Sequence, residues 1–194
     1  MELQRKTSSV VITMASVVVA VVVAILSQLF VFSTYHVPSG SMMPTIMPGD
    51  AVIVSGPLWD QLDPDPTIQR GDMIVFSDEQ GWLTGTPDPN AYLTKRIIGL
   101  PGDRITQDKN GHLYINGERY TDPTAHQPAP QTPYSVTVPE GKLWVLGDNR
   151  QNSADSRYHH QVDQTGFVDI SSVEGTVRGV LPLHKINPPP FTGD

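Results

Sequence analysis

The sequence predicts a mainly β domain that follows one N-terminal transmembrane helix, and three observations support this fold class. A run of 23 residues without a charged side chain spans positions 10–32. Beyond it, short apolar runs alternate with turn residues, and 18 prolines and 16 glycines among 194 residues favour turns over a helical bundle. No stretch after residue 33 keeps a helical hydrophobic period over eleven residues.

The uncharged run has the properties of a membrane anchor. As a helix it would be about 35 Å long at ~1.5 Å per residue, enough to cross a hydrocarbon core of about 30 Å. A cleavable secretory signal is the alternative, but its apolar region is only about 7–15 residues long and ends at a small-residue cleavage site, which this chain lacks.

Flanking charge predicts the orientation of this anchor. Arg5 and Lys6 precede it, whereas the next basic residue, Arg70, lies far beyond it. Basic residues favour the cytoplasmic side of a membrane. We therefore expect a chain in the cell membrane with three parts: a cytoplasmic segment over 1–9, a transmembrane helix over 10–32 and an extracytoplasmic catalytic β domain over 33–194.

The β strands of this domain are predicted from alternating or continuous apolar runs between turns. These runs are residues 51–56, 72–77, 93–98, 112–117, 134–138 and 143–147. Asn116-Gly117 stands between two alternating stretches, which is a strong signal for a hairpin turn. We expect surface loops in the proline-rich stretches 57–69 and 121–133, and a frayed tail over 187–194.

Composition excludes several classes of function. The formal net charge of −7 argues against a nucleic-acid partner. The absence of cysteine excludes disulfides, thiol catalysis and zinc–thiolate sites. His159 and His160 suggest a metal site, but adjacent residues on a strand point to opposite faces, so we expect surface histidines there. No metal and no cofactor are predicted.

Three segments are unusually rich in residues that can carry chemistry. The first, 37–45, places two serines around Gly40, which permits a tight backbone turn. The second, 92–103, places Lys95 among apolar neighbours, and the third, 147–157, is a dense run of polar and charged side chains. Taken singly, the first segment is better explained as an ordinary turn and the second as a strand with a solvent-facing lysine. The third also fits a solvated loop.

The available chemistry includes a serine with either a histidine or a lysine as its base. Four of the six histidines lie in loops or tails without an adjacent acidic or serine motif, and a lysine is the other option. A nucleophile in a chain without cysteine is a serine, a threonine, a lysine or a carboxylate. A lysine can act as a base near neutral pH only if its pKa falls by about 3 units, which burial among apolar side chains can cause. The apolar residues around Lys95 offer such a setting.

Taken together, the segments resemble those of type I signal peptidases, the membrane-anchored Ser–Lys proteases that remove signal peptides from exported proteins. Four motifs carry the resemblance in the order found in that family: PSGSMMPT (38–45), RGDMIVF (70–76), KRIIGLPGD (95–103) and GDNRQNSADSR (147–157). They cover the core of the chain from 37 to 157, and beyond 157 the match fades.

The resemblance implies a role for each matching residue. Ser41 is the implied nucleophile and Lys95 the implied general base, with the Ser39 hydroxyl and the Ser41 backbone N–H as the oxyanion hole. Ser153 would orient the lysine. The implied supporting ion pairs are Asp155 with Arg157 and Asp148 with Arg96.

The resemblance also implies the substrate, an exported preprotein cut after small side chains at positions −1 and −3. An extended peptide can add to an exposed strand edge with alternate side chains entering pockets. Val37, Ile46 and Thr94 flank the two predicted catalytic residues and are expected to wall those pockets. The lipid bilayer is the second expected partner.

Other functions stay open at this point. A specialised Ser–Lys peptidase, such as a pilus or plasmid-transfer maturation enzyme, would use the same residues. A self-cleaving repressor of the Ser–Lys type is disfavoured, because an anchor occupies the place of a DNA-binding segment. A non-catalytic β module that binds exported segments is the third alternative, and the presence of both Ser41 and Lys95 argues against it.

Overall fold

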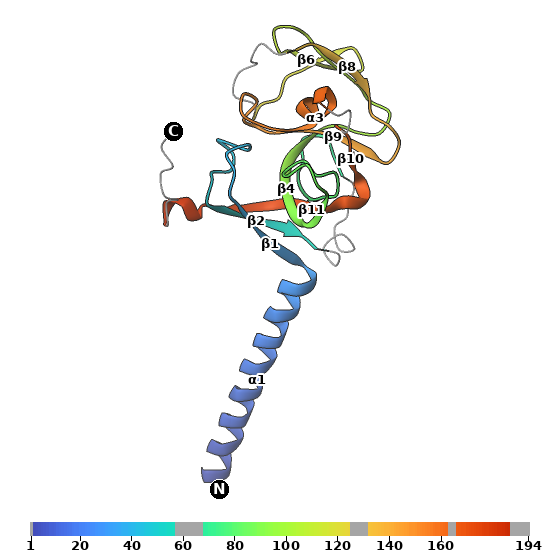
Figure 1. Cartoon of the computed structure of the whole chain (residues 1–194). Helices are drawn as coiled ribbons and strands as arrows, with labels where there is room; N and C mark the ends of the chain where they lie inside the picture. The colour runs from blue at the N-terminus through green and yellow to red at the C-terminus, as the bar shows by residue number, and fades with distance from the viewer. Residues whose placement is uncertain (1, 57–67, 125–131, 163–165, 187–194) are drawn as a thin grey trace.

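The computed structural model describes residues 2–56, 68–124, 132–162 and 166–186. Helix α1 (Glu2–Phe30) projects from a β body and leads into its first strand (Figure 1). The helix therefore includes most of residues 1–9 and ends two residues before the predicted boundary at Phe32. The predicted tail and most of both predicted proline-rich loops lie outside the described residues.

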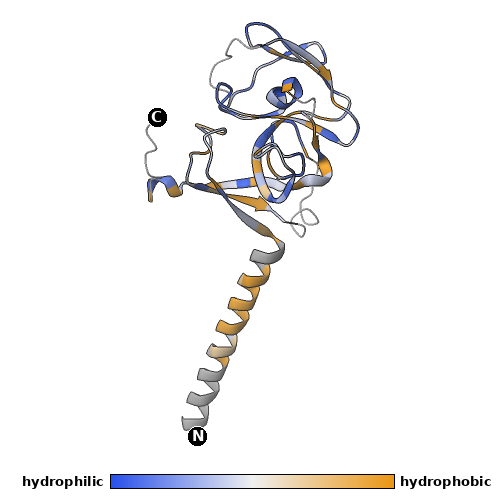
Figure 2. Cartoon of the chain, in the orientation of Figure 1, coloured by the Kyte–Doolittle hydropathy of each residue, from blue (hydrophilic) through white to orange (hydrophobic). Residues whose placement is uncertain are grey.

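The described part of α1 is apolar and exposed. Figure 2 shows its central stretch as hydrophobic, and the large apolar side chains from Ile12 to Leu26 are exposed. Within the described residues, no helix combines the length and the apolar character needed to cross a membrane. The membrane span expected over 10–32 thus stays a prediction.

Seven antiparallel strands form the larger sheet, in the order β1–β2–β11–β3–β4–β9–β10. Their bounds are β1 (Phe32–Val37), β2 (Asp50–Ser55), β11 (Val173–Leu181), β3 (Met73–Asp78), β4 (Asp88–Gly99), β9 (Lys142–Leu146) and β10 (Val168–Asp169). β1 lies at one edge of this sheet.

A smaller antiparallel sheet sits over the far end of the body, in the order β7–β6–β5–β8 (Figure 1). Its strands are β7 (Glu118–Tyr120), β6 (Leu113–Ile115), β5 (Arg104–Gln107) and β8 (Tyr134–Thr137). One short α-helix, α3 (Ser156–Val162), and two 3₁₀ turns, η1 (Ile170–Ser172) and η2 (Leu183–Lys185), complete the described elements.

The structure confirms a mainly β domain and each of the six predicted strands. The predicted hairpin is present between β6 and β7, and both of its turn residues, Asn116 and Gly117, have positive φ. The predicted strands did not include β1, β5, β10 or β11, and α3 was not predicted either. β5, β10 and α3 are too short for a measurable hydrophobic period.

The histidine prediction is wrong. His159 and His160 lie on α3 and not on a strand, and His159 is buried with its ring stacked on Trp82 at a centroid distance of 4.4 Å. Two consecutive residues on a helix both face a neighbouring sheet more easily than two on a strand do. The burial of His159 and the half-burial of His160 are thus packing features of α3.

Three clusters of buried apolar side chains hold the domain together. One fills the space between β3, β4 and β9, and a second joins Trp144 of β9 to Ile105 of β5, which fixes the smaller sheet on the larger. The third packs Met42 and Ile46 against β2 and β3, although both residues belong to the loop between β1 and β2. This loop is therefore seated on the sheet.

Gly99 occupies a place in the second cluster where no side chain fits. A Cβ at this position would lie 2.9 Å from both Trp144 Cβ and Val138 Cγ2. We expect Gly99→Ala to lower the free energy of unfolding by about 1–3 kcal/mol, because overpacking forces neighbours out of place. Denaturant unfolding of the detergent-solubilised chain measures this difference.

Gly179→Ala is the matched control for that variant. Gly179 also lies in a strand of the larger sheet, but its added Cβ would meet only Ile53 Cδ1 at 3.8 Å, an ordinary contact. Its stability should stay within about 1 kcal/mol of wild type. Equal stability of the two variants would contradict this account of the second cluster.

Candidate active site

The loop 38–47 presents Ser41 from between two buried anchors. Met42 and Ile46 are fully buried, and the Ile46 N–H donates to the Met42 carbonyl at 3.0 Å. A second turn forms where the Met43 N–H donates to the Gly40 carbonyl at 3.2 Å. Ser41 therefore lies on a short, internally bonded loop whose Met42 and Ile46 side chains enter the core and whose two serine hydroxyls line the groove.

Lys95 reaches Ser41 from β4. Its side chain is only 4% exposed, and Nζ lies 2.9 Å from Ser41 Oγ and 3.2 Å from the Thr94 carbonyl oxygen. Ser39 Oγ is 3.3 Å from Ser41 Oγ on the other side. Two polar groups, the Lys95 amine and the Ser39 hydroxyl, thus meet at the Ser41 hydroxyl oxygen.

The surroundings of Lys95 change its acidity. Burial of the ammonium group lowers the pKa of Lys95 from 10.5 to about 8, although the nearby Asp155 carboxylate acts in the opposite direction. Desolvation disfavours the charged form of a lysine. Near pH 8, about half of the molecules therefore carry a neutral amine that can accept a proton.

Asp155 is fully buried behind this lysine and is held by several donors. Arg157 donates to it through Nε at 2.9 Å and Nη2 at 2.6 Å, and the Gly147 N–H donates at 3.0 Å. Burial alone would raise the pKa of Asp155, but Arg157 and these hydrogen bonds bring it below its usual value. The predicted pair of Asp155 and Arg157 is therefore present.

The predicted pair of Arg96 and Asp148 is present too. Arg96 donates to Asp148 through Nε at 2.7 Å and Nη2 at 2.6 Å, a bidentate contact. Thr45 of the Ser41 loop donates its hydroxyl to the same carboxylate at 2.5 Å. Asp148 thus ties β4 to the loop that carries Ser41.

Two residues of the polar segment touch the Ser41 loop directly, and sequence reasoning gave them no role. Asn149 donates its backbone N–H to the Ser41 carbonyl at 3.0 Å and its side-chain amide to the Gly40 carbonyl at 3.1 Å. A Cβ on Gly147 would lie 2.4 Å from the Ser41 carbonyl oxygen. Their place in the GDNRQNSADSR motif was the one available signal.

Ser153 lies close to Gly147 and the Ser41 loop and makes no hydrogen bond to Lys95. A Cβ on Gly147 would meet Ser153 Oγ at 2.3 Å, which places this hydroxyl behind the Ser41 loop. Within the described part of the chain, the Ser153 hydroxyl makes no hydrogen bond. Its orienting role therefore stays a prediction.

A groove of about 360 Å³ opens at Ser41 and Lys95. Its walls come from the end of β1, from the N-terminal half of β4, from the β3–β4 turn and from the polar loop, and they include Val37 and Thr94. Ile46, which was also predicted as a pocket wall, is 0% exposed beneath the loop and supports Ser41 from the core instead. Trp82 and Leu83 line the groove, and sequence patterns did not indicate either.

No metal-binding cluster of three or more histidine, aspartate or glutamate side chains forms among the residues that the structure places. The two serine hydroxyls and the lysine amine meet at the groove, whose lining also includes His36 and Asn152. A hydroxyl beside a partly neutral amine is suited to nucleophilic attack on a carbonyl carbon.

The chain is similar to known proteins. The family model described as "Signal peptidase, peptidase S26" matches residues 10–181. A signal peptidase I of Bacillus amyloliquefaciens is 36% identical over 196 residues, covering 95% of both chains, and one of Bacillus caldolyticus is 37% identical over 173 residues, covering 82% of this chain and 84% of the relative. A crystal structure of a signal peptidase I from Enterococcus faecalis shares 31% identity, covers 57% of this chain and 97% of that chain, and has a TM-score of 0.44. The chain belongs to the signal peptidase family, peptidase S26.

Proposed function

We propose that this protein is a serine endopeptidase that removes N-terminal signal peptides from exported preproteins through a Ser41–Lys95 dyad. The observation that carries the proposal is the 2.9 Å separation between Ser41 Oγ and the buried Lys95 Nζ. Family membership supports the substrate class, since the relatives are signal peptidases I.

The chemistry proceeds in two halves. Neutral Lys95 accepts the Ser41 hydroxyl proton as Oγ attacks the scissile carbonyl carbon, and the resulting ammonium protonates the departing amine. A water molecule then gives a proton to Lys95 and attacks the acyl-enzyme ester, which releases the signal peptide with a free carboxyl end. Lys95 returns its proton to Ser41 as the ester bond breaks.

The oxyanion of each tetrahedral intermediate needs donors that are already in place. We assign this role to the Ser39 hydroxyl and the Ser41 backbone N–H, because Ser39 Oγ lies 3.3 Å from the attacking oxygen. One such donor contributes about 2.7–4 kcal/mol in other proteases. The ion pairs of Asp148 and Asp155 keep both loops in position for this step.

The substrate lies in extended form between β1 and β4. β1 is an edge strand, and the N-terminal half of β4 extends beyond its pairing with β9, which involves Arg96 to Gly99. Four successive antiparallel pairings lead from β1 through β2, β11 and β3 to β4, so β1 and β4 run in the same direction. A peptide between them can pair with both edges while small side chains at −1 and −3 enter pockets beside Val37 and Thr94.

We also propose that α1 anchors the protein in the cytoplasmic membrane with the β domain outside. Residues 10–32 carry no charge, and the described apolar side chains of α1 are exposed along the helix. Exposed apolar side chains over such a length suit a lipid environment. A preprotein whose signal peptide crosses the same membrane would then enter the groove parallel to β1.

Substitution of the dyad tests the mechanism. Ser41→Ala and Lys95→Arg should each lower kcat by about 10⁴-fold or more, because neither a methyl group nor a guanidinium can do the chemistry. The double variant Ser41→Ala/Lys95→Ala should lose no more than either single change. Preprotein cleavage by purified full-length protein, with products identified by mass spectrometry, measures the effect.

Lys142→Arg is the matched control for the lysine change. Lys142 lies on β9 and pairs with Asp169 at 2.5 Å, away from the groove, so its replacement by arginine should leave kcat near that of wild type. Near-normal turnover by Lys95→Arg would contradict the Ser–Lys mechanism.

The pH dependence tests the identity of the base. Only the neutral form of Lys95 accepts a proton, so kcat/KM should rise with pH through a midpoint near 8 and then level off. His112→Asn, a change at a half-buried histidine far from the groove, should leave the midpoint in place. A midpoint near 6.5 that disappears when a histidine is substituted would show that this histidine, and not Lys95, is the base.

Topology can be measured in whole cells. If the β domain is outside, protease added to intact spheroplasts should digest residues 33–194, while a cytoplasmic marker protein stays intact. If the domain is digested only after the membrane is opened, the proposed orientation is wrong, and so is the proposed role in export.

A further inference from the structure

Asp122 connects the smaller sheet to the polar loop 147–157 beside the dyad. It lies two residues after the end of β7, and its side chain is only 4% exposed. One carboxylate oxygen accepts the Thr124 backbone N–H at 2.9 Å and the Thr124 hydroxyl at 2.6 Å, and the other pairs with the Arg150 guanidinium. Asp122 therefore binds its own turn with one oxygen and a distant segment of the chain with the other.

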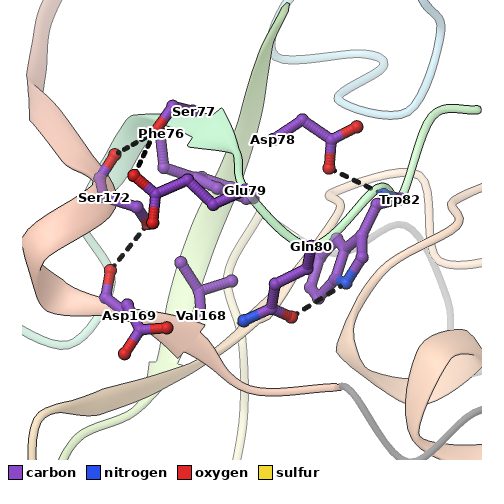
Figure 3. Close-up of a pocket in the computed structure, with 9 residues that line it drawn as sticks. All are labelled: Phe76, Ser77, Asp78, Glu79, Gln80, Trp82, Val168, Asp169 and Ser172. Atoms are coloured by element: carbon purple, nitrogen blue, oxygen red, sulfur yellow. Dashed lines mark hydrogen bonds between the residues drawn. The ribbon is translucent and has the colours of Figure 1, made fainter. Parts of the chain in front are cut away.

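A second buried aspartate shows that a turn of this kind does not need a cation. The Asp78 carboxylate accepts the backbone N–H groups of Trp82 at 2.6 Å and Leu83 at 2.9 Å. Figure 3 shows the bond between Asp78 and Trp82 in the turn after β3. Among the residues that the structure describes, no cation pairs with Asp78. The pairing of Asp122 with Arg150 thus links two segments and is not a requirement of its turn.

Arg150 carries this contact on to Gly147. Its side chain is 8% exposed, and its Nε donates to the Gly147 carbonyl at 3.0 Å. Burial lowers the pKa of Arg150, while the Asp122 charge acts in the opposite direction. Burial alone would raise the pKa of Asp122, but its bonds to Thr124 and the Arg150 charge keep it below its usual value. A buried guanidinium needs an opposite charge beside it, so Asp122 stabilises Arg150 in this place.

Gly147 lies between Arg150 and the dyad. Its N–H donates to Asp155 at 3.0 Å, and a Cβ on it would lie 2.4 Å from the Ser41 carbonyl oxygen. Asp155 is the carboxylate whose charge favours the protonated form of Lys95. A displacement of Gly147 would therefore disturb both the Ser41 loop and the charge behind Lys95.

The same segment of the smaller sheet reaches a second residue of the polar loop. Thr124 Oγ1 lies 3.4 Å from Asp148 Oδ1. The Asp148 carboxylate also accepts the bonds from Arg96 of β4 and from Thr45 of the Ser41 loop. Residues 122–124 thus meet the polar loop where it supports both strands of the site.

We propose that Asp122 is a positioning residue for the peptidase reaction, which acts through Arg150 to hold the polar loop behind Ser41 and Lys95. The inference rests on the proposed function, because that function depends on the geometry of the dyad. Asp122 lies outside the four sequence motifs and does not line the groove, so its effect reaches the substrate through the loop. The smaller sheet takes part in catalysis through this contact.

Loss of the Asp122 charge should change the acidity of Lys95 in a definite direction. The titratable groups whose charges act on Arg150 are Asp122, Asp155, Arg157 and Tyr134. Without Asp122, the Arg150 charge acts on Asp155, which is also the charged group that acts on Lys95. The pKa of Lys95 should then fall, because a positive charge nearby disfavours its ammonium form.

Asp122→Asn tests the proposal, because it removes the charge and keeps the size of the side chain. In preprotein cleavage by detergent-solubilised full-length protein, kcat on the high-pH plateau should fall by about tenfold, since a misplaced catalytic group slows the reaction. KM should stay within about twofold of wild type, because Asp122 does not line the groove. The midpoint of the kcat/KM profile should move from near 8 to about half a unit lower.

Asp108→Asn is the matched control. Asp108 lies between β5 and β6 of the same sheet, where its carboxylate is 3.1 Å from the His112 ring. This variant changes a carboxylate to an amide without touching the contact with the polar loop. Its kcat, its KM and the midpoint of its pH profile should stay as in wild type.

The double variant Asp122→Asn/Arg150→Met separates the charge from the geometry. With both charges removed, the midpoint should return to near 8, while kcat stays about tenfold low because the Gly147 carbonyl has lost the Arg150 donor. A neutral pair leaves no buried charge without its partner, so this variant decides the matter if Asp122→Asn alone does not fold.

The outcomes are distinct. Wild-type kcat with an unmoved midpoint in Asp122→Asn, or wild-type kcat in the double variant, would overturn the positioning role. A lower rate that matches a loss of folded protein in denaturant unfolding, with an unmoved midpoint, would assign Asp122 to stability and overturn it too. If wild type cleaves no preprotein, the proposed function is wrong. Titration of the Lys95 amine by nuclear magnetic resonance, which needs no turnover, then decides the effect of Asp122, and an equal midpoint in wild type and Asp122→Asn overturns it.

Discussion

The burial of the Lys95 amine is the constraint on which the site depends. Moving its pKa from 10.5 to about 8 corresponds to about 3 kcal/mol of free energy taken from folding. Because the unfolded chain holds this proton more tightly, the cost is fully present below pH 8 and disappears as the pH rises towards 10.5. The apolar clusters around β3, β4 and β9 offset this cost, and in return the folded protein keeps a usable base beside a serine hydroxyl.

The charged groups around Ser41 and Lys95 hold these two residues in position. Buried ion pairs add little net stability, because the loss of hydration offsets much of their attraction. Here the bidentate contact of Arg96 with Asp148, together with the Thr45 hydroxyl on the same carboxylate, joins β4 to the Ser41 loop. Asn149 adds two bonds to the backbone of that loop. Rigid support of this kind is what a short distance between Ser41 and Lys95 requires.

The sequence was sufficient for the six predicted strands and the hairpin at Asn116-Gly117, because alternation and turn chemistry are local signals. The resemblance of its motifs to those of a known family also pointed to Ser41 and Lys95, which the structure brings within 2.9 Å of each other. The sequence could not show that Met42 and Ile46 face the core, since the loop that holds them has no periodic pattern. The burial of His159 depends on contact with Trp82, 77 positions away. Leu83 was missed for the opposite reason, because an exposed leucine gains meaning only from the groove beside it.

The central claim is that burial lowers the pKa of Lys95 to about 8, so that part of the protein carries a neutral amine near that pH, and titration of the side chain tests it most directly. Nuclear magnetic resonance of the Lys95 ε-carbon, labelled with ¹³C in the full-length Ser41→Ala variant, follows the proton without turnover. A Lys95→Arg version of that variant identifies the signal by its loss. The account predicts a midpoint near 8 for this signal. A midpoint near 10.5 would leave the amine charged and contradict its role as the base.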